Sequence, residues 1–200
     1  MSQQRPTGVI LCGGKSSRML GQTKAFVDFA GETLLNRIIR RFESQVHGLI
    51  LSVAEDQSGY QSIDFPKVND IVSGPHGPLM GLASAFQSTE AKVDLVLCPC
   101  DAPFAPSTLV AALEEKILAE NADIVCPSYE GELQPTFALW NKRTAHRVIQ
   151  AATKEGIGGL RVLYSEFNAV QLEWPKQKRS PFFNINTPED LNFARESLTD

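Results

Sequence analysis

The chain has 200 residues, of which 42% are hydrophobic and 21% are charged, and its formal net charge at pH 7 is -4. Such a chain suits a single globular domain, so we expect residues 1–200 to fold as one unit. The acidic balance argues against broad binding to nucleic acid or to acidic membranes.

No apolar stretch approaches the roughly 20 residues that a membrane helix needs, and the first eight residues lack the apolar core of a signal peptide. We therefore expect a cytoplasmic protein. Cys12, Cys98, Cys100 and Cys126 lie in or beside apolar runs, so we expect reduced thiols packed in the core. A structural metal at Cys98-Pro99-Cys100 is not expected, because no second Cys or His pair has a matching spacing.

In the first half of the chain, short apolar runs alternate with helical patterns. The helix that begins at Glu32-Thr33 is predicted from apolar residues that recur three and four positions apart, and it ends at His47-Gly48. The other elements are, in chain order, a strand at 9–12, an apolar patch at 25–29, strands at 49–54 and 67–70, a turn-rich segment at 73–81, and a helix from residue 82.

The second half continues the alternation. Its strongest strand is 93–98, an uninterrupted apolar run of the kind that parallel sheets bury on both faces. A helix begins at Pro106-Ser107, and another at Thr187-Pro188, where Thr caps the helix and Pro occupies its first turn. The remaining elements are strands at 123–127, 134–140 and 182–186, a weakly alternating segment at 168–174, and helices at 142–153 and after 156–159.

Strands that alternate with helices predict a three-layer α/β/α fold with a mostly parallel sheet. In such sheets, ligands bind beyond the carboxyl ends of the strands. Ser52 lies in the second predicted strand, Asp70 ends the third, and Asp101 follows the central one, while a Gly-Gly loop follows the first. We therefore expect these features to lie along one rim of the sheet.

The loop after the first strand is the clearest candidate for a binding site. Gly13 and Gly14 remove side chains that would keep a ligand from the backbone, and Lys15, Arg18 and Lys24 follow with no acid among them. Backbone N–H groups and nearby cations suit a nucleotide triphosphate. The residue order matches neither the dinucleotide fingerprint nor the P-loop, and a βα turn with a cationic exposed face is the alternative.

Asp101 stands at the end of the strongest strand, between Pro99 and Pro103. A rigidly held carboxylate there suits Mg²⁺, which takes one or two protein carboxylates and completes its octahedron with phosphate oxygens and water. The alternative role is a cap for the helix that begins near Pro106, and the separation along the chain favours the metal.

These residues suit nucleotidyl transfer. Lys24 and Arg18 would neutralise the charge that develops on a leaving pyrophosphate, since such reactions depend mainly on positioning and electrostatics. An attacking phosphate monoester is already ionised at neutral pH and needs no general base. The three histidines, which are scattered along the chain, are therefore expected to be structural or solvated; they are His47, His76 and His146.

Five segments resemble motifs of the nucleotidylyltransferases. Residues 11–19 with Lys24 resemble the signature LAGGxSxRMGxDK, and residues 99–103 resemble the metal-binding block PCDxP. The others are residues 77–81, similar to the GPLAG loop, residues 134–136, similar to the xPT segment, and residues 184–191, similar to the NxNTPEDL ending. They occur in the family's order over nearly the whole chain, and they most resemble the MobA-like family of molybdenum cofactor guanylyltransferases.

The resemblance implies a Rossmann-like, GT-A-like fold and transfer of GMP from Mg-GTP to the terminal phosphate of the molybdenum–molybdopterin cofactor, with release of pyrophosphate. It implies Arg18, Lys24 and Asp101 as catalytic residues and Asp101 as the Mg²⁺ ligand. It assigns to the GTP site Leu11, Cys12, Gly13, Gly14, Lys24, Ser52, Asp70 and Asp101, and to the molybdopterin side Pro135, Thr136, Asn184 and Asn186. Partner proteins would be transient, either enzymes of cofactor biosynthesis or acceptors of the cofactor.

Two features leave alternatives open. Guanine's N1–H and N2–H₂ donors suit a carboxylate, which favours Asp70 as a contact, while a helix or turn cap is its other role. Leu20 and Thr23 replace the family's Gly and acid near Lys24, Cys12 replaces Ala, and Ser52 stands where Asn is common. The loop also fits a molybdopterin cytidylyltransferase or a sugar-phosphate nucleotidylyltransferase. A non-catalytic nucleotide-binding regulator is the alternative outside the enzymes.

Overall fold

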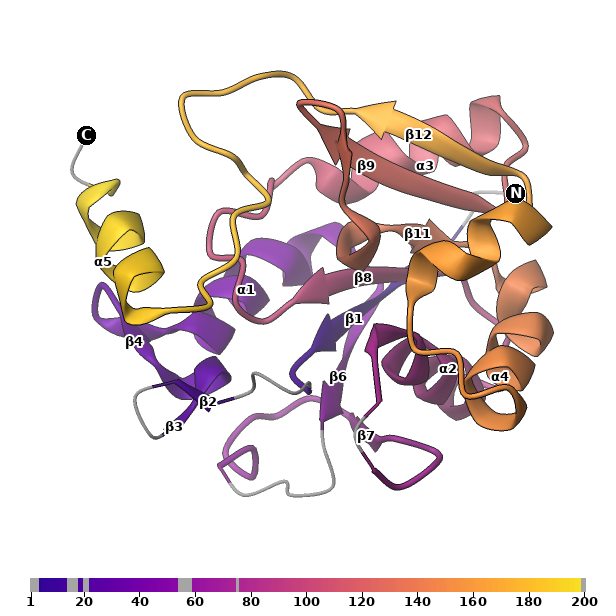
Figure 1. The fold of residues 1–200 in the computed structure, drawn as a ribbon, viewed down its shortest axis with the longest axis horizontal. Coiled ribbons are helices and arrows are strands. Elements are labelled where there is room, and N and C mark those ends of the chain that lie inside the picture. Colours follow the sequence, from indigo (N-terminus) through magenta and orange to yellow (C-terminus); the bar gives the residue numbers. More distant parts are fainter. Residues whose placement is uncertain (1–3, 14–17, 20–21, 54–58, 75, 199–200) are drawn as a thin grey trace.

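The computed structural model describes residues 4–13, 18–19, 22–53, 59–74 and 76–198. Within these ranges one large sheet has the strand order β10-β9-β11-β8-β1-β6-β7, with β12 paired to β9 (Figure 1). Its strands are β1 Thr7–Leu11, β6 Gly48–Val53, β7 Lys67–Asn69, β8 Leu95–Pro99, β9 Ile124–Tyr129, β10 Glu132–Leu133, β11 Leu139–Trp140 and β12 Ala169–Glu173.

Most of this sheet is parallel, as the sequence predicted. Strand β1 pairs in parallel with β6 and β8, and β6 pairs in parallel with β7. Strand β11 runs antiparallel between β8 and β9, and β12 extends the sheet beyond β9 in parallel. The antiparallel β11 lets the chain return across the sheet between two strands that point the same way.

Helices cover both faces of the sheet, so the predicted three layers are present (Figure 1). The apolar residues of α1 and α3 share one buried cluster with Ile10, whereas those of α2 and α4 share another with Val9. Val9 and Ile10 enter different clusters because successive strand residues point to opposite faces. The helices are α1 Leu34–Phe42, α2 Pro78–Ser88, α3 Leu109–Ala119, α4 Ala145–Lys154 and α5 Pro188–Glu196.

A third, smaller cluster lies beside the sheet, where α5 approaches the hairpin of β4 (Asp28–Phe29) and β5 (Glu32–Thr33) (Figure 1). Ile185, Leu191 and Ala194 from the C-terminal segment join Val27 and Phe29 in it. The remaining short elements are strands β2 Arg18–Met19 and β3 Gln22–Thr23, and 3-10 turns η1 Lys24–Phe26, η2 Glu43–Gln45, η3 Pro135–Phe137, η4 Lys142–Thr144 and η5 Leu160–Glu166.

Two helices begin at positions set by local chemistry. The side chain of Thr33 accepts a hydrogen bond from Asn36 N at 3.1 Å, so α1 starts after Thr33, and Glu32 belongs to β5. Helix α2 starts at Pro78, earlier than predicted, because Gly77 supplies an extended N-terminal residue and Pro78 fits the first turn.

Two predicted strands are wrong in whole or in part. Of residues 134–140, only Leu139–Trp140 forms a strand, because Pro135 has no N–H for a ladder and opens the 3-10 turn η3 instead. Residues 182–186 belong to no strand among the described residues. Their backbone is used elsewhere: Ile185 N–H donates to the carbonyl of Asp101 at 2.9 Å.

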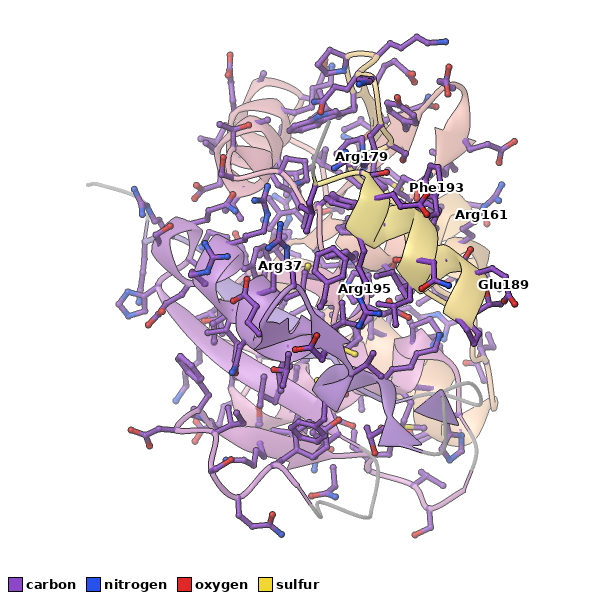
Figure 2. All side chains as sticks on the ribbon, turned by 90° about the vertical axis from the view of Figure 1, so that its left-hand side faces the viewer. Arg37, Arg161, Arg179, Glu189, Phe193 and Arg195 are labelled. Carbon is purple, nitrogen blue, oxygen red and sulfur yellow. The ribbon has the colours of Figure 1, made fainter. Side chains whose placement is uncertain are left out.

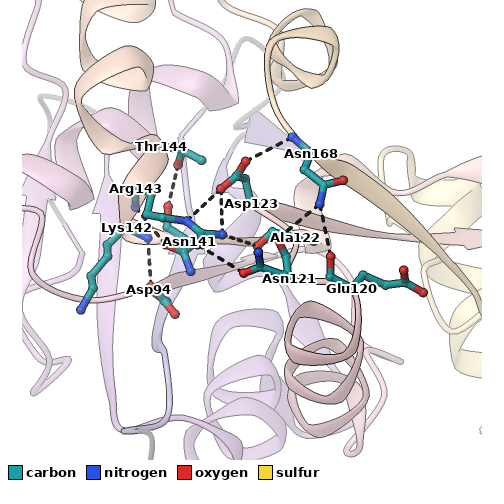
Figure 3. Close-up of polar contacts among 10 residues, drawn as sticks. All are labelled: Asp94, Glu120, Asn121, Ala122, Asp123, Asn141, Lys142, Arg143, Thr144 and Asn168. Atoms are coloured by element: carbon teal, nitrogen blue, oxygen red, sulfur yellow. Dashed lines mark hydrogen bonds and ion pairs between the residues drawn. The ribbon is translucent and has the colours of Figure 1, made fainter.

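The amino ends of β9 and β12 carry a network of polar side chains (Figure 3). Arg143 donates from Nε to Asp123 Oδ1 at 2.9 Å and from Nη2 to the carbonyl of Ala122 at 3.0 Å. Asp123 also accepts from Asn168 N–H at 3.2 Å through Oδ2. These contacts join the loops that precede neighbouring strands.

Within the described ranges, no helix is long and apolar enough to cross a membrane.

Candidate active site

The carboxyl ends of four strands meet at one edge of the sheet. In the β register Leu11 lies beside Ser52 of β6 and Pro99 of β8, and Ser52 lies beside Val68 of β7. The loops that follow these strands therefore leave the sheet side by side, as the sequence predicted. This is the edge at which parallel α/β sheets bind ligands.

Two backbone hydrogen bonds extend the pairing of the strands into the first residues of the loops. Cys12 N–H donates to the carbonyl of Ser52 at 2.8 Å, and Cys100 N–H donates to the carbonyl of Leu11 at 3.1 Å. Helix α2 packs closely against this region at Gly81, where a Cβ atom would lie 2.6 Å from Ser52 Oγ. The first residues of both loops are therefore held rigidly.

Lys24 is the centre of the described polar contacts at this edge. Its side chain is only 5% exposed, and its Nζ atom lies 3.2 Å from Asp101 Oδ2 and 2.6 Å from Asn186 Oδ1. An ammonium has three donors, so one remains after these contacts for a further acceptor such as a phosphate oxygen. Lys24 and Asp101 were predicted to share the site; the contact with Asn186 was not predicted.

The position of Asp101 alters its acidity. Burial raises the pKa of the Asp101 carboxyl above its ordinary value, and the nearby charge of Lys24 and its hydrogen bond oppose that rise. The side chain is 16% exposed. A carboxylate with little water around it and one cationic neighbour is a favourable ligand for a further cation, because binding replaces lost solvation.

The cysteines near the site are free and buried, as expected. Burial raises the pKa of Cys98, while the hydrogen bond with Cys12, followed by burial, raises the pKa of Cys100 well above its ordinary value. Thiols of this kind remain protonated at neutral pH and are poor nucleophiles. They serve as packing beneath the loops.

Asn184 and Asn186 reach the same edge from the far end of the chain. The bond from Ile185 N–H to the carbonyl of Asp101 places the residues on either side of Ile185 next to β8's loop. The Oδ1 atom of Asn184 is buried and accepts no hydrogen bond from the described residues. A buried acceptor without a donor is costly unless a ligand, water or ion satisfies it.

The other predicted site residues are described by their burial and by the elements that carry them. Asp70 is half-buried directly after β7, and Gly13 is exposed after Cys12. Pro135 and Thr136 lie half-buried in η3, and the hydrogen bonds described for Lys24 go to neither of them. The structure does not describe Gly14 or the side chain of Arg18.

The backbone of Arg18 still bears on the site, because β2 pairs with β3 and sets Arg18 opposite Thr23, the residue before Lys24. Sequence reasoning missed the close approach at Gly81 and the role of Asp190, whose carboxylate accepts from the backbone of Asn186. From the sequence, Thr187 and Pro188 predicted only a helix start, although the spacing Thr187-x-x-Asp190 is also present. This spacing signals that an acid folds back onto the residues before the helix.

The donor set fits a magnesium ion that shares its coordination with phosphate. No group of three or more His, Cys, Asp or Glu side chains with the arrangement of a metal site occurs in the described part of the chain. Mg²⁺ does not require one, because it commonly uses one or two carboxylates together with substrate phosphates and water. Asp101 supplies one carboxylate, and Asn184, the residue before the one bonded to the Asp101 carbonyl, carries a buried Oδ1 without a donor among the described residues.

Comparisons with known proteins identify the family of the chain. The family described as MobA-like NTP transferase domain matches residues 8–170. The molybdenum cofactor guanylyltransferase of Rhodopseudomonas palustris (strain HaA2) is 33% identical over 190 residues, which cover 93% of this chain and 89% of that protein.

Among solved structures, molybdopterin-guanine dinucleotide biosynthesis protein A from Archaeoglobus fulgidus matches with a TM-score of 0.79 and 21% identity, covering 96% of this chain and 98% of that one. A Mycobacterium tuberculosis protein solved in complex with manganese matches with a TM-score of 0.70 and 15% identity, covering 97% of this chain and 100% of that one. At these identities the structures support a common fold.

Proposed function

Because this chain belongs to the MobA-like NTP transferase family and is a nucleotidyltransferase, we propose that it transfers GMP from GTP to the terminal phosphate of molybdenum–molybdopterin. The products are the guanine dinucleotide form of the cofactor and pyrophosphate. The observation that carries the proposal is the buried pair of Lys24 and Asp101 at the carboxyl edge of the sheet.

In the proposed reaction, an oxygen of the acceptor's terminal phosphate attacks the α-phosphorus of GTP, and the bond from that phosphorus to the bridging oxygen breaks. Negative charge then collects on the departing pyrophosphate. Lys24, held by Asp101 and Asn186, has one N–H donor left to direct at this charge. No side chain needs to accept a proton, because a phosphate monoester is ionised at neutral pH.

We propose Mg²⁺ as the metal and Asp101 as its protein ligand. When bound there, the ion would neutralise phosphate charge and orient the triphosphate. Burial of Asp101 supports this assignment, because a cation relieves the cost of keeping a carboxylate out of water. The fixed base of the loop after β1 and the neighbouring Ser52 would hold the phosphates and the sugar.

The proposed GTP site comprises Leu11, Cys12, Gly13, Gly14, Lys24, Ser52 and Asp101, with Asp70 on the guanine, and Arg18 is proposed to be catalytic together with Lys24 and Asp101. The position of Asp70 at the end of β7, on the same sheet edge, supports this role. The proposed molybdopterin side comprises Pro135, Thr136, Asn184 and Asn186. We further propose that residues 1–200 act as a single domain, and that partner proteins which supply or collect the cofactor bind transiently.

The test is to incubate the purified protein and Mg²⁺ with molybdenum–molybdopterin and each of the four NTPs in turn, and to measure pyrophosphate. We expect release with GTP and loss of release in the Asp101→Asn variant. Release with CTP alone would instead identify a cytidylyltransferase. Binding of a nucleotide without release from any of the four would identify a regulatory protein.

A further inference from the structure

The C-terminal segment contributes directly to the position of Lys24. Asn186 Oδ1 lies 2.6 Å from Lys24 Nζ, yet Asn186 is an exposed residue. Packing around its side chain therefore does not explain why the amide stays on the lysine. Ordering an exposed side chain costs conformational entropy, and a backbone that is already fixed reduces this cost.

The backbone of Asn186 is fixed from two sides. On one side, Ile185 N–H donates to the carbonyl of Asp101 at 2.9 Å. On the other, Asn186 N–H and Thr187 N–H both donate to Asp190 Oδ2, each at 2.9 Å. These backbone bonds lower the pKa of Asp190, with the bond from Asn186 contributing most, so the carboxylate is ionised at neutral pH.

The helix that carries Asp190 is docked on the segment that carries Lys24. Helix α5 crosses this side of the molecule, and Arg195 extends from it (Figure 2). Arg195 Nη2 donates to the carbonyl of Asp28 at 2.8 Å, four residues after Lys24. Leu191 of α5 shares the third buried cluster with Val27 and Phe29. Asp190 therefore has a fixed position relative to η1.

We propose that Asp190 is a positioning residue for Lys24 and acts through the backbone of Asn186. Its carboxylate holds the turn before α5 in the one arrangement that directs the Asn186 amide oxygen at the ammonium. Asn186 adds an acceptor without adding negative charge beside Asp101. The hydrogen bond to Lys24 thus comes from a neutral amide, while the ionised Asp190 acts on Lys24 at longer range through its charge. This role rests on the proposed function of Lys24.

The first test compares turnover of Asp190→Ala with that of the wild type, followed as pyrophosphate release with GTP, Mg²⁺ and the cofactor. A misplaced catalytic group commonly costs on the order of tenfold to 10²-fold, so we expect kcat to fall by about tenfold. KM for GTP should change less, because Lys24 acts mainly on charge that develops during the reaction.

A double-mutant cycle then tests whether the loss of kcat in Asp190→Ala depends on Lys24. In the Lys24→Met background, Asp190→Ala should change kcat by less than about twofold, because groups that act on one another are not additive. A tenfold loss in both backgrounds would show that Asp190 affects catalysis by another route, and would overturn the proposal.

Thr187→Ala is the matched control. It removes the hydroxyl that accepts from Asp190 N–H at 3.1 Å, and so weakens the same helix end, but it leaves both backbone bonds to Asp190 Oδ2 in place. We expect a lower Tm and unchanged kcat. If Thr187→Ala and Asp190→Ala lose kcat in proportion to their losses of Tm, Asp190 is only a helix cap.

A readout that needs no turnover separates this proposal from the proposed function. Brief acetylation with acetic anhydride, followed by peptide mass spectrometry, gives the reactivity of Lys24 relative to exposed Lys154. We expect Asp190→Ala to raise that ratio several-fold and Thr187→Ala to leave it unchanged. If the wild type turns over no NTP, the proposed function fails, and the labelling still shows whether Asp190 positions Lys24. An unchanged ratio in Asp190→Ala would overturn the positioning role.

Discussion

The two edges of the sheet use charged side chains in different ways. At the amino edge, the 51% exposed side chain of Arg143 contacts Asp123 and the neighbouring backbone carbonyl of Ala122 (Figure 3). At the carboxyl edge, Lys24 is 5% exposed and contacts a carboxylate whose pKa is raised by burial. The first arrangement joins loops at little electrostatic cost, whereas the second retains charges out of water.

The difference in exposure indicates that the ion pair at the amino edge serves stability and that the pair at the carboxyl edge serves function. Exposed ion pairs contribute little to stability because water and salt screen them. A buried pair costs desolvation energy that folding alone does not recover, so its retention favours a role in binding or catalysis. Variants at the two edges should therefore separate activity from stability.

The largest expected effect is at Asp101. Replacement of Asp101 by Asn keeps the size of the side chain and removes its charge, so we expect turnover to fall by about 10³-fold if it holds the metal. Pyrophosphate release measures the loss, and circular dichroism with thermal unfolding checks the fold. A variant that fails to fold would mean that the carboxylate serves the loop structure.

Lys24→Met should have the next largest effect on activity. Methionine has a side chain of similar length but no ammonium group. Loss of one donor that stabilises developing charge costs about 10²-fold in kcat. The pKa of Asp101 should also rise further, because Lys24 opposes the rise due to burial. An NMR titration of the Asp101 carboxyl measures this second effect. Turnover within about twofold of wild type would remove Lys24 from the mechanism.

The pH dependence of stability gives a smaller test of the carboxyl edge. The ordinary pKa of Asp101 is 3.8 and burial raises it in the folded chain. As the pH rises past 3.8, the unfolded chain loses this proton first, so the contribution of Asp101 to the free energy of unfolding falls until the pH exceeds the raised pKa.

Asp101→Asn lacks that decrease. The difference in free energy of unfolding between wild type and variant should therefore shift in the variant's favour across this window, and remain constant above it. Urea unfolding at a series of pH values measures the shift. A shift in the opposite direction would show that Lys24 outweighs burial.

The smallest effect is expected at the amino edge. Arg143→Ala removes an exposed ion pair and two further contacts, so we expect a loss of about 0.5–1 kcal/mol in the free energy of unfolding. Turnover should stay unchanged, because Arg143 precedes α4 at the opposite edge from Lys24. A loss of kcat without loss of stability would contradict the division between the edges.

Local patterns in the sequence were sufficient to predict many of the strands and helices. The continuous apolar run of β8 and the helical spacing of α1 predicted their elements and, through them, a parallel sheet with its loops at one rim. The two strand predictions that were wrong lay where the backbone has other uses. Pro135 cannot donate to a ladder, and Ile185 N–H bonds to the loop of Asp101.

The sequence by itself determined the strand and helix periods, the turns at glycine and proline, and the presence of Lys24 and Asp101 after predicted strands, since these follow from neighbours in the chain. Only the tertiary structure decided that Asn186, 162 positions away, contacts Lys24. That contact depends on α5 packing beside Phe29 and on Asp190 holding the preceding turn. Such packing arises between distant segments, where spacing along the chain carries no information about distance in space.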